Sequence, residues 1–303
     1  MDKDKTLLIC DVSEAALTRF KEETKGQGKV EIVSDGYRAV EAADYVFTML
    51  PDAPAVESVY LDKSTGILAG VIAAAKEAPV HKLIVECGTI QSATILEVAR
   101  STEDAARTLP DGSSLDFSDA PVSGGPMGAS SGTLAFMVGS NKPDTVFPAV
   151  HSVLKHMGNP DSIFLCGRVG AGTAFKVINN YLSAITSLAA SEALNIGGKL
   201  GLDLKTLTTV INASGGQCWV TSKSNPVPGV QANVPSSRDY EGGFRIELCK
   251  KVLQMGMDLA EQAGARTILD RPTMQAFEEA AADERYKGKD ARVVYKWLRE
   301  SSR

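Results

Sequence analysis

The stretch GRVGAGTAFKVINNYL, residues 167–182, decides how the chain is organised. Three glycines in it precede an apolar, helix-forming run, so we expect a long helix to begin here. Lys176 and Asn180 lie four residues apart in that run, and one turn of helix places them on the same face. The apolar neighbours of Lys176 would remove water from its amine and so lower its pKa.

Spacing alone leaves two interpretations of this pair open. In the first, Lys176 acts chemically, and Asn180 holds a carboxylate or hydroxyl of the molecule on which it acts. In the second, Lys176 extends its ammonium into water and Asn180 packs locally. Polar pairs at this spacing are common on helices, which favours the second interpretation until other observations are added.

Upstream of this stretch, strand-like and helix-like segments alternate. Apolar runs such as TLLIC at 6–10, YVFTML at 45–50 and KLIVECGTI at 82–90 are separated by helical patterns, the first of which Ser13 can cap. This alternation predicts an α/β fold, a Rossmann-type, mostly parallel sheet with helices on both faces. Ligands bind such sheets at the carboxyl ends of the strands.

Downstream of the same stretch the pattern is helical. A continuous helix is expected to about Leu200, Asp203 can cap the next one, and a long glycine- and proline-rich loop follows. Further helical patterns cover 247–263, 272–282 and 290–299. We therefore predict an NAD-binding domain at 1–168 and an all-helical substrate and dimerisation domain at 169–303, joined by the long helix.

Composition excludes several classes of protein. The net charge of -5 offers no basic surface for nucleic acid or anionic lipid. The five cysteines form no CxxC pair and the three histidines no metal-spaced pair, so we expect free thiols and no metal site. No apolar run is long enough to span a bilayer, and no signal peptide is recognisable.

An acidic residue ends the first predicted strand. Asp11 could bind the 2′-hydroxyl of a dinucleotide ribose, which would favour NAD over NADP, or it could simply begin the turn into the next helix. A GxGxxG turn should precede such an acid by about 20 residues. Only ten residues precede Asp11, and none is glycine. We therefore expect the first strand and glycine turn to be missing and the affinity for NAD to be weak.

Several longer stretches resemble the β-hydroxyacid dehydrogenase family, and within it the 3-hydroxyisobutyrate dehydrogenases. The matching stretches are TMLPD at 48–52, DAPVSGGPMGASSGTLAFMVG at 119–139, GAGTAFKVINN at 170–180, GLD at 201–203, GQCWVTSKSNPVPGV at 216–230 and DYEGGF at 239–244. They span nearly the whole chain. The proline-rich loop is the most discriminating, because other branches of the family differ there.

This resemblance implies an activity and a set of site residues. The activity is the NAD-dependent oxidation of 3-hydroxyisobutyrate to methylmalonate semialdehyde in valine breakdown. Lys176 would be the catalytic lysine and Asn180 would orient the substrate. The substrate carboxylate would lie in a cradle of Ser123, Gly124 and Gly125, and Trp219 would form part of the pocket wall. The implied cofactor contacts are Leu50, Pro51, Thr89, Phe244 and Lys251, in addition to Asp11.

Two other functions stay open at this point. One is an NADPH-linked tartronate semialdehyde or glyoxylate reductase, against which Asp11 and the NPVPGV loop argue. The other is a non-catalytic binding or subunit-pairing protein built on the same fold. In each case the long helix favours a homo-oligomer, a dimer or tetramer. The family works in mitochondria; residues 1–12 show no Arg-rich presequence, and without one the expected location is cytoplasmic.

Overall fold

Two compact units make up the structure, a computed structural model that describes residues 5–301. Unit 1 takes the chain up to Gly124 together with Ser131–Thr173, and unit 2 takes Gly125–Ser130 and the chain from Ala174 onward. The predicted boundary, between residues 168 and 169, lies a few residues before this one. Segment 125–130 was not expected in the second unit. The roles given to the two domains remain a proposal.

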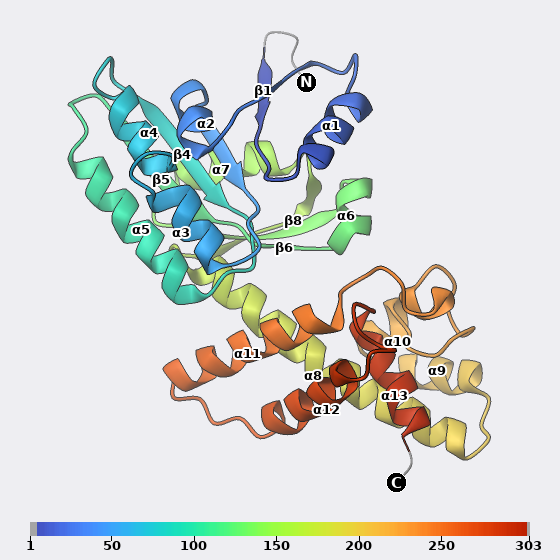
Figure 1. The fold of residues 1–303 in the computed structure, drawn as a ribbon. Helices are drawn as coiled ribbons and strands as arrows, with labels where there is room; N and C mark the ends of the chain where they lie inside the picture. The colour runs from blue at the N-terminus through green and yellow to red at the C-terminus, as the bar shows by residue number, and fades with distance from the viewer. Residues whose placement is uncertain (1–4, 302–303) are drawn as a thin grey trace. The chain divides into compact units, whose positions relative to one another are not determined.

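Unit 1 is an α/β domain, as predicted (Figure 1). Its strands are β1 (Thr6–Ile9), β2 (Lys29–Ile32), β3 (Tyr45–Thr48), β4 (His81–Glu86), β5 (Ser114–Asp119), β6 (Val122–Ser123), β7 (Leu134–Ser140) and β8 (Gly158–Gly167). Its helices are α1 (Glu14–Glu23), α2 (Gly36–Ala42), α3 (Ala53–Leu61), α4 (Ile67–Ala74), α5 (Ser92–Arg107) and α7 (Val146–Leu154).

The strands of unit 1 form two separate sheets. β1 and β2 pair in parallel as a two-stranded sheet, and the other strands form a six-stranded sheet in the order β3-β4-β5-β7-β6, with β8 on β7. The pairs β3–β4, β4–β5 and β7–β8 are parallel, whereas β5–β7 and β6–β7 are antiparallel. The sheet system is therefore mostly parallel, which confirms the fold class.

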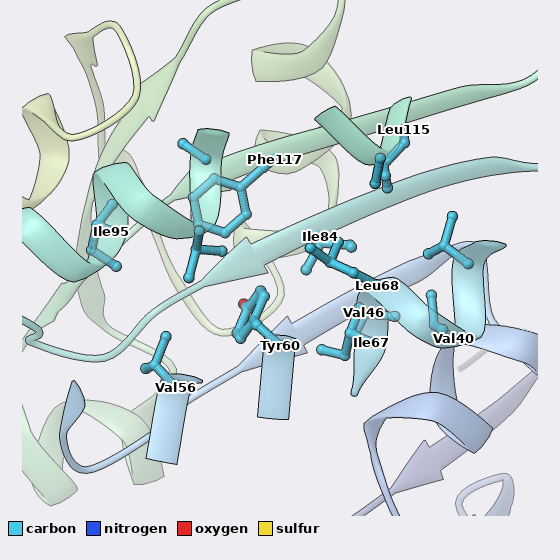
Figure 2. Close-up of a cluster of buried hydrophobic side chains, with 14 of the residues drawn as sticks. Val40, Val46, Val56, Tyr60, Ile67, Leu68, Ile84, Ile95, Leu115 and Phe117 are labelled. Carbon is cyan, nitrogen blue, oxygen red and sulfur yellow. The ribbon is translucent and has the colours of Figure 1, made fainter. Parts of the chain in front are cut away.

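Alternate residues of β4 face two different cores. Ile84 belongs to a cluster with side chains of α3, α4 and α5, of which Figure 2 shows Tyr60, Ile67 and Ile95 around it. Leu83 and Val85 point to the opposite face, into a cluster that includes Val150 of α7. Because strand side chains alternate between faces, the apolar run from Leu83 to Val85 in β4 contributes to both cores, and the strand is covered by helices on both sides.

Two details of unit 1 could not be expected from the alternation of apolar runs alone. The stretch LDFSDAPV at 115–122 contributes to two strands, because β5 ends at Asp119 and β6 begins at Val122, with Pro121 between them. Helix α3 was not predicted, although the Asp52 side chain caps it by accepting the Ala55 N–H at 3.0 Å and a proline stands in its first turn. Both are recognised start signals for a helix.

Unit 2 is all-helical apart from its loops. It holds α6 (Gly125–Ser131), most of α8 (Ala171–Lys199), α9 (Leu204–Asn212), α10 (Trp219–Lys223), η1 (Pro235–Arg238), α11 (Ile246–Gln262), α12 (Asp270–Ala282), η2 (Ala291–Val293) and α13 (Val294–Glu300). Asp203 caps α9 as predicted, accepting the Thr206 N–H at 2.8 Å. Between residues 5 and 301, no helix combines the length and apolar character needed to cross a bilayer.

The core of unit 2 forms where α8, α11 and α12 pack together. Leu188 of α8, Leu253 of α11 and Phe277 of α12 belong to one buried cluster. The α8–α11 crossing is close, because a Cβ on Gly256 would lie 2.7 Å from the Tyr181 ring. The long helix predicted from the sequence is therefore held along its length by its neighbours rather than by its own propensity.

Candidate active site

Lys176 lies in the second turn of α8 and is buried, with 8% of its surface exposed. Its sequence neighbour Val177 packs against Val252 and Met255 of α11. Burial lowers the pKa of the Lys176 ammonium from 10.5 to about 8. A lysine with that pKa exists in both protonation states near neutral pH, so it can take up or donate a proton during a reaction. Asn180 is half-buried one turn further along α8.

The start of α8 is fixed by Asp119, a residue that the sequence prediction missed. Its buried carboxylate ends β5 and accepts the backbone N–H groups of Gly170 and Thr173, both at 2.7 Å. These bonds satisfy donors that a helix start leaves free, and the negative charge faces the positive end of the helix dipole. Lys176 lies one turn further along α8, so Asp119 helps to fix its position by fixing the first turn of the helix.

The predicted carboxylate cradle is a sharp turn between β6 and α6. Ser123 ends β6, and Gly124 and Gly125 follow with φ angles of 134° and 61°. L-residues rarely adopt such values, so the conformation itself calls for glycine. A Cβ on Gly125 would meet no heavy atom of the described residues within 4 Å, so the backbone there is open to a ligand.

Three of the predicted cofactor contacts come together at one edge of the six-stranded sheet. β3 and β4 are parallel neighbours with Thr48 opposite Glu86, so Leu50 and Pro51 follow one strand where Thr89 follows the other. The two segments touch, because a Cβ on Gly88 would lie 2.6 Å from the Leu50 carbonyl oxygen. Apolar side chains beside a hydroxyl suit a nicotinamide riboside, and this is the edge where such sheets bind ligands. The chemistry of Leu50, Pro51 and Thr89 is therefore compatible with bound NAD.

Glu86, also missed from the sequence, joins these two segments. Its carboxylate is fully buried, and it accepts the Gly88 N–H at 2.6 Å and the hydroxyl of Thr48, with the Tyr60 hydroxyl at 3.4 Å. Burial raises the pKa of Glu86, and hydrogen bonds that include one from the Leu50 N–H partly oppose the rise. The side chain therefore holds the backbone before Pro51 against the backbone before Thr89. The available signal in the sequence was an acid directly after the apolar run LIV at 83–85.

Asp11 is not part of this edge. It follows β1 in the separate two-stranded sheet, and its Oδ1 accepts the Ser13 N–H at 2.7 Å in the turn that begins α1. This is the second of the two uses that the sequence allowed for Asp11. Its role on a ribose hydroxyl stays a prediction.

The remaining candidates lie in unit 2. Lys251 is on α11 directly before Val252, whose contact with Val177 brings this part of α11 against the Lys176 turn of α8. Trp219 opens α10, and Phe244 precedes α11. Two residues that were not predicted connect them: Asp290 accepts the Phe244 N–H, and Arg292 lies over the Trp219 ring. Residues 5–301 contain no cluster of His, Cys, Asp or Glu that could hold a metal ion.

Two family models match consecutive parts of the chain. Residues 1–170 match the NAD binding domain of 6-phosphogluconate dehydrogenase. Residues 170–298 match the family described as NAD-binding of NADP-dependent 3-hydroxyisobutyrate dehydrogenase. The first match begins at residue 1, so the expectation that the N-terminal part of this domain is missing was wrong. The expected weak affinity for NAD stays a prediction. A whole-domain pattern of strands and helices outweighs one short motif.

Individual relatives agree with these matches. Human mitochondrial 3-hydroxyisobutyrate dehydrogenase is 35% identical over 97% of this chain and 80% of its own length. An NAD-dependent L-serine dehydrogenase of Pseudomonas aeruginosa is 38% identical over 76% of this chain and 70% of its own length. A solved 3-hydroxyisobutyrate dehydrogenase of Mycobacterium tuberculosis, with L-serine, has a TM-score of 0.78 and 30% identity over 97% of this chain and 99% of that one. The chain is therefore a member of the 3-hydroxyisobutyrate dehydrogenase family, an NAD-dependent oxidoreductase.

Proposed function

We propose that this enzyme oxidises 3-hydroxyisobutyrate to methylmalonate semialdehyde, with Lys176 as its general base. The observation that supports this most is the buried Lys176 amine, whose pKa burial lowers to about 8. Bound NAD supplies the nicotinamide ring that accepts the hydride. As the substrate C–H bond is broken, the neutral Lys176 amine takes the hydroxyl proton, which leaves a carbonyl group on the substrate.

The other candidate residues bind and orient the substrate in this proposal. Backbone N–H groups of the Ser123–Gly125 turn hold the substrate carboxylate, which the open backbone at Gly125 allows. The Asn180 amide hydrogen-bonds the substrate one helical turn beyond the base, and Trp219 forms an apolar wall. Leu50, Pro51, Thr89, Phe244, Lys251 and Asp11 contact NAD.

A direct assay tests the substrate. We expect NADH formation from (S)-3-hydroxyisobutyrate and NAD, with kcat/KM at least tenfold above that for L-serine or glycerate, because a single mismatched methyl or hydroxyl group in an apolar pocket changes binding by about 1–3 kcal/mol. Initial rates at 340 nm over a range of each hydroxyacid provide the measurement. Oxidation of none of these acids would contradict the proposal.

L-Serine oxidation is a second candidate, favoured by the name of the Pseudomonas aeruginosa relative. L-Serine is also a β-hydroxyacid, so the same base and carboxylate cradle could serve it. The ratio of the two kcat/KM values in the assay above decides between them. A higher value for L-serine would assign the enzyme to that reaction.

Self-association is a further part of the proposal. Exposed apolar side chains recur along α8 and directly after its end at spacings of three, four or seven residues, which places them on one face of the helix, as in a helix that packs against a partner. They are Ile178, Leu182, Ala189, Ala193, Ile196 and Leu200. Ala189 and Ala193 also line a mostly apolar groove of about 410 Å³ beside the loop at 215–218. We infer that a second copy of the chain covers this face.

Sedimentation velocity measures this association. We expect a dimer or tetramer at micromolar concentration, and we expect Leu182→Glu to shift it toward monomer, since a charge would be buried in the interface. Lys205→Glu, on exposed α9, is the matched control. A monomer of the unmodified protein would contradict the inference.

The names of several relatives also suggest a cellular context. Relatives from human, Dictyostelium discoideum and Arabidopsis thaliana are called mitochondrial. We propose that this enzyme acts in mitochondria on the hydroxyacid formed in valine breakdown. Cell fractionation followed by the assay above tests this, and activity confined to the cytoplasmic fraction would contradict it.

A further inference from the structure

A buried charge pair lies next to two of the proposed site residues in unit 2. Asp290 precedes η2 and Arg292 lies within it, and their side chains are only 1% and 10% exposed. Arg292 Nη1 lies 3.3 Å from Asp290 Oδ2. The guanidinium carbon of Arg292 lies 5.3 Å from the centroid of the Trp219 ring, which is within the range of a cation–π interaction.

Asp290 is anchored by the backbone around it. Its Oδ2 accepts the Phe244 N–H at 2.8 Å, and its Oδ1 accepts the Arg292 N–H at 2.9 Å. Backbone bonds from Asp290 N–H to the Tyr240 carbonyl and from Ala291 N–H to the Phe244 carbonyl join the same two segments. A Cβ on Gly243 would overlap Asp290 Oδ2, so the segment before Phe244 packs directly on the carboxylate. The charge that faces Arg292 is therefore fixed in place.

The burial of Arg292 contributes little to the stability of the fold. Its Nε is buried and has no hydrogen-bond partner among the described residues. A buried ion pair is often no more stabilising than apolar side chains of the same size, and an unsatisfied donor adds a further cost. The distinctive contact of Arg292 is the ring of Trp219, a residue that is 58% exposed in the structure. A planar cation over one face of an exposed indole restricts the rotation of the ring.

We propose that Arg292, held by Asp290, is a positioning residue that fixes the Trp219 indole in the wall of the substrate pocket and thereby sets the KM for the hydroxyacid. This inference rests on the proposed function, which places Trp219 in that pocket. The same Asp290 carboxylate holds the backbone of Phe244, so one buried pair links a proposed substrate contact to a proposed cofactor contact.

Arg292→Lys is the test variant, because lysine keeps a positive charge beside Asp290 but lacks the planar group that covers the ring. The chain contains two tryptophans, so a Trp297→Phe background leaves Trp219 as the single reporter. We expect Arg292→Lys to lower the fluorescence anisotropy of Trp219 and to raise the KM for the hydroxyacid about three- to tenfold, the range a cation–π contact corresponds to. The kcat and the KM for NAD are expected to stay within about twofold of the background values.

Two further variants make the result specific. Arg285→Lys is the matched control, because Arg285 also covers an aromatic ring, that of Tyr286 at 5.0 Å, and this ring is not a proposed contact of substrate or NAD. It is expected to change neither KM nor anisotropy. Trp219→Leu is expected to raise the KM for the hydroxyacid, and adding Arg292→Lys to it is expected to raise the KM no further, since Arg292 acts through the ring.

Three results would overturn the inference: unchanged anisotropy in Arg292→Lys, an unchanged KM in that variant, or independent effects of the two substitutions in the double variant. Failure of the proposed function looks different. Suppose that Trp219→Leu leaves the KM for every hydroxyacid unchanged, while Arg292→Lys lowers the anisotropy of Trp219. Trp219 is then not in the substrate pocket, and Arg292 does not affect the KM through it, although the two side chains are in contact.

Discussion

Lys176→Met is expected to lower kcat by about 10²–10⁴-fold, the usual contribution of a general base. Methionine keeps the apolar stem of the side chain and removes only the amine, so the buried site is not left empty. NADH binding, measured by fluorescence titration, is expected to stay within about threefold, because in the proposed mechanism the lysine acts on the substrate hydroxyl. Lys199→Met, at the exposed end of the same helix, is the matched control and should retain full activity.

Lys176→Arg separates a base from a permanent cation. Arginine keeps the positive charge but cannot be deprotonated in a protein. If Lys176 is the base, this variant should be as inactive as Lys176→Met. If a cation at this position only stabilises the developing alkoxide, a substantial part of kcat should survive. Full activity of either variant would remove Lys176 from the mechanism.

The pH dependence of the unmodified enzyme tests independently whether Lys176 acts as a neutral base or as a cation. With a pKa of about 8, the neutral amine is the minor form at pH 7 and the major form at pH 9. Activity that needs the neutral amine should rise about tenfold over this interval, since it follows the neutral fraction. Activity that needs the ammonium should fall by the same factor. The profile of kcat/KM against pH from 6 to 9.5 provides the measurement, and its rising limb should disappear in Lys176→Arg.

Features set by local sequence were the ones that could be predicted. The Ser13 cap of α1, the Asp203 cap of α9 and the length of α8 all follow from residues within a few positions of one another. A buried Lys176 was one of the two interpretations that its apolar sequence neighbours allowed, and its side chain is buried in the structure. Whether that lysine is catalytic could not be inferred from the helix alone, because a lysine that reaches water has the same spacing.

Features that depend on distant segments could not be predicted. No role for Glu86 or Asp119 was predicted from the sequence, and their functions appear once Leu50, Gly88 and the start of α8 are brought to them. Arg292 and Trp219 are more than 70 positions apart, and no local pattern relates them. The prediction that the N-terminal part of the domain is missing failed for a different reason. It gave one absent motif, the glycine turn, more weight than the pattern of the whole domain.

The start of α8 also accounts for the largest stability effect that we expect. Gly172 lies in the first turn, and a Cβ there would overlap the Met137 carbonyl oxygen of β7 and approach Asp119 Oδ2 to 3.0 Å. Gly172→Ala should therefore destabilise the protein by about 2–3 kcal/mol, because backbone atoms on both sides must move. This corresponds to a melting temperature lower by about 4–10 °C.

Gly198→Ala, near the other end of α8, is the matched control. A Cβ there would come no closer than 3.7 Å to another atom, and alanine favours helix over glycine by up to about 1 kcal/mol, so this variant should melt slightly higher than the unmodified protein. Differential scanning calorimetry of the two variants measures both shifts. Opposite signs at two glycines of one helix would show that Gly172 is required by its contact with β7 and not by the helix. Since Lys176 follows four residues later, Gly172→Ala should also lower kcat, whereas a stable and fully active Gly172→Ala would mean that the base tolerates movement of the helix start.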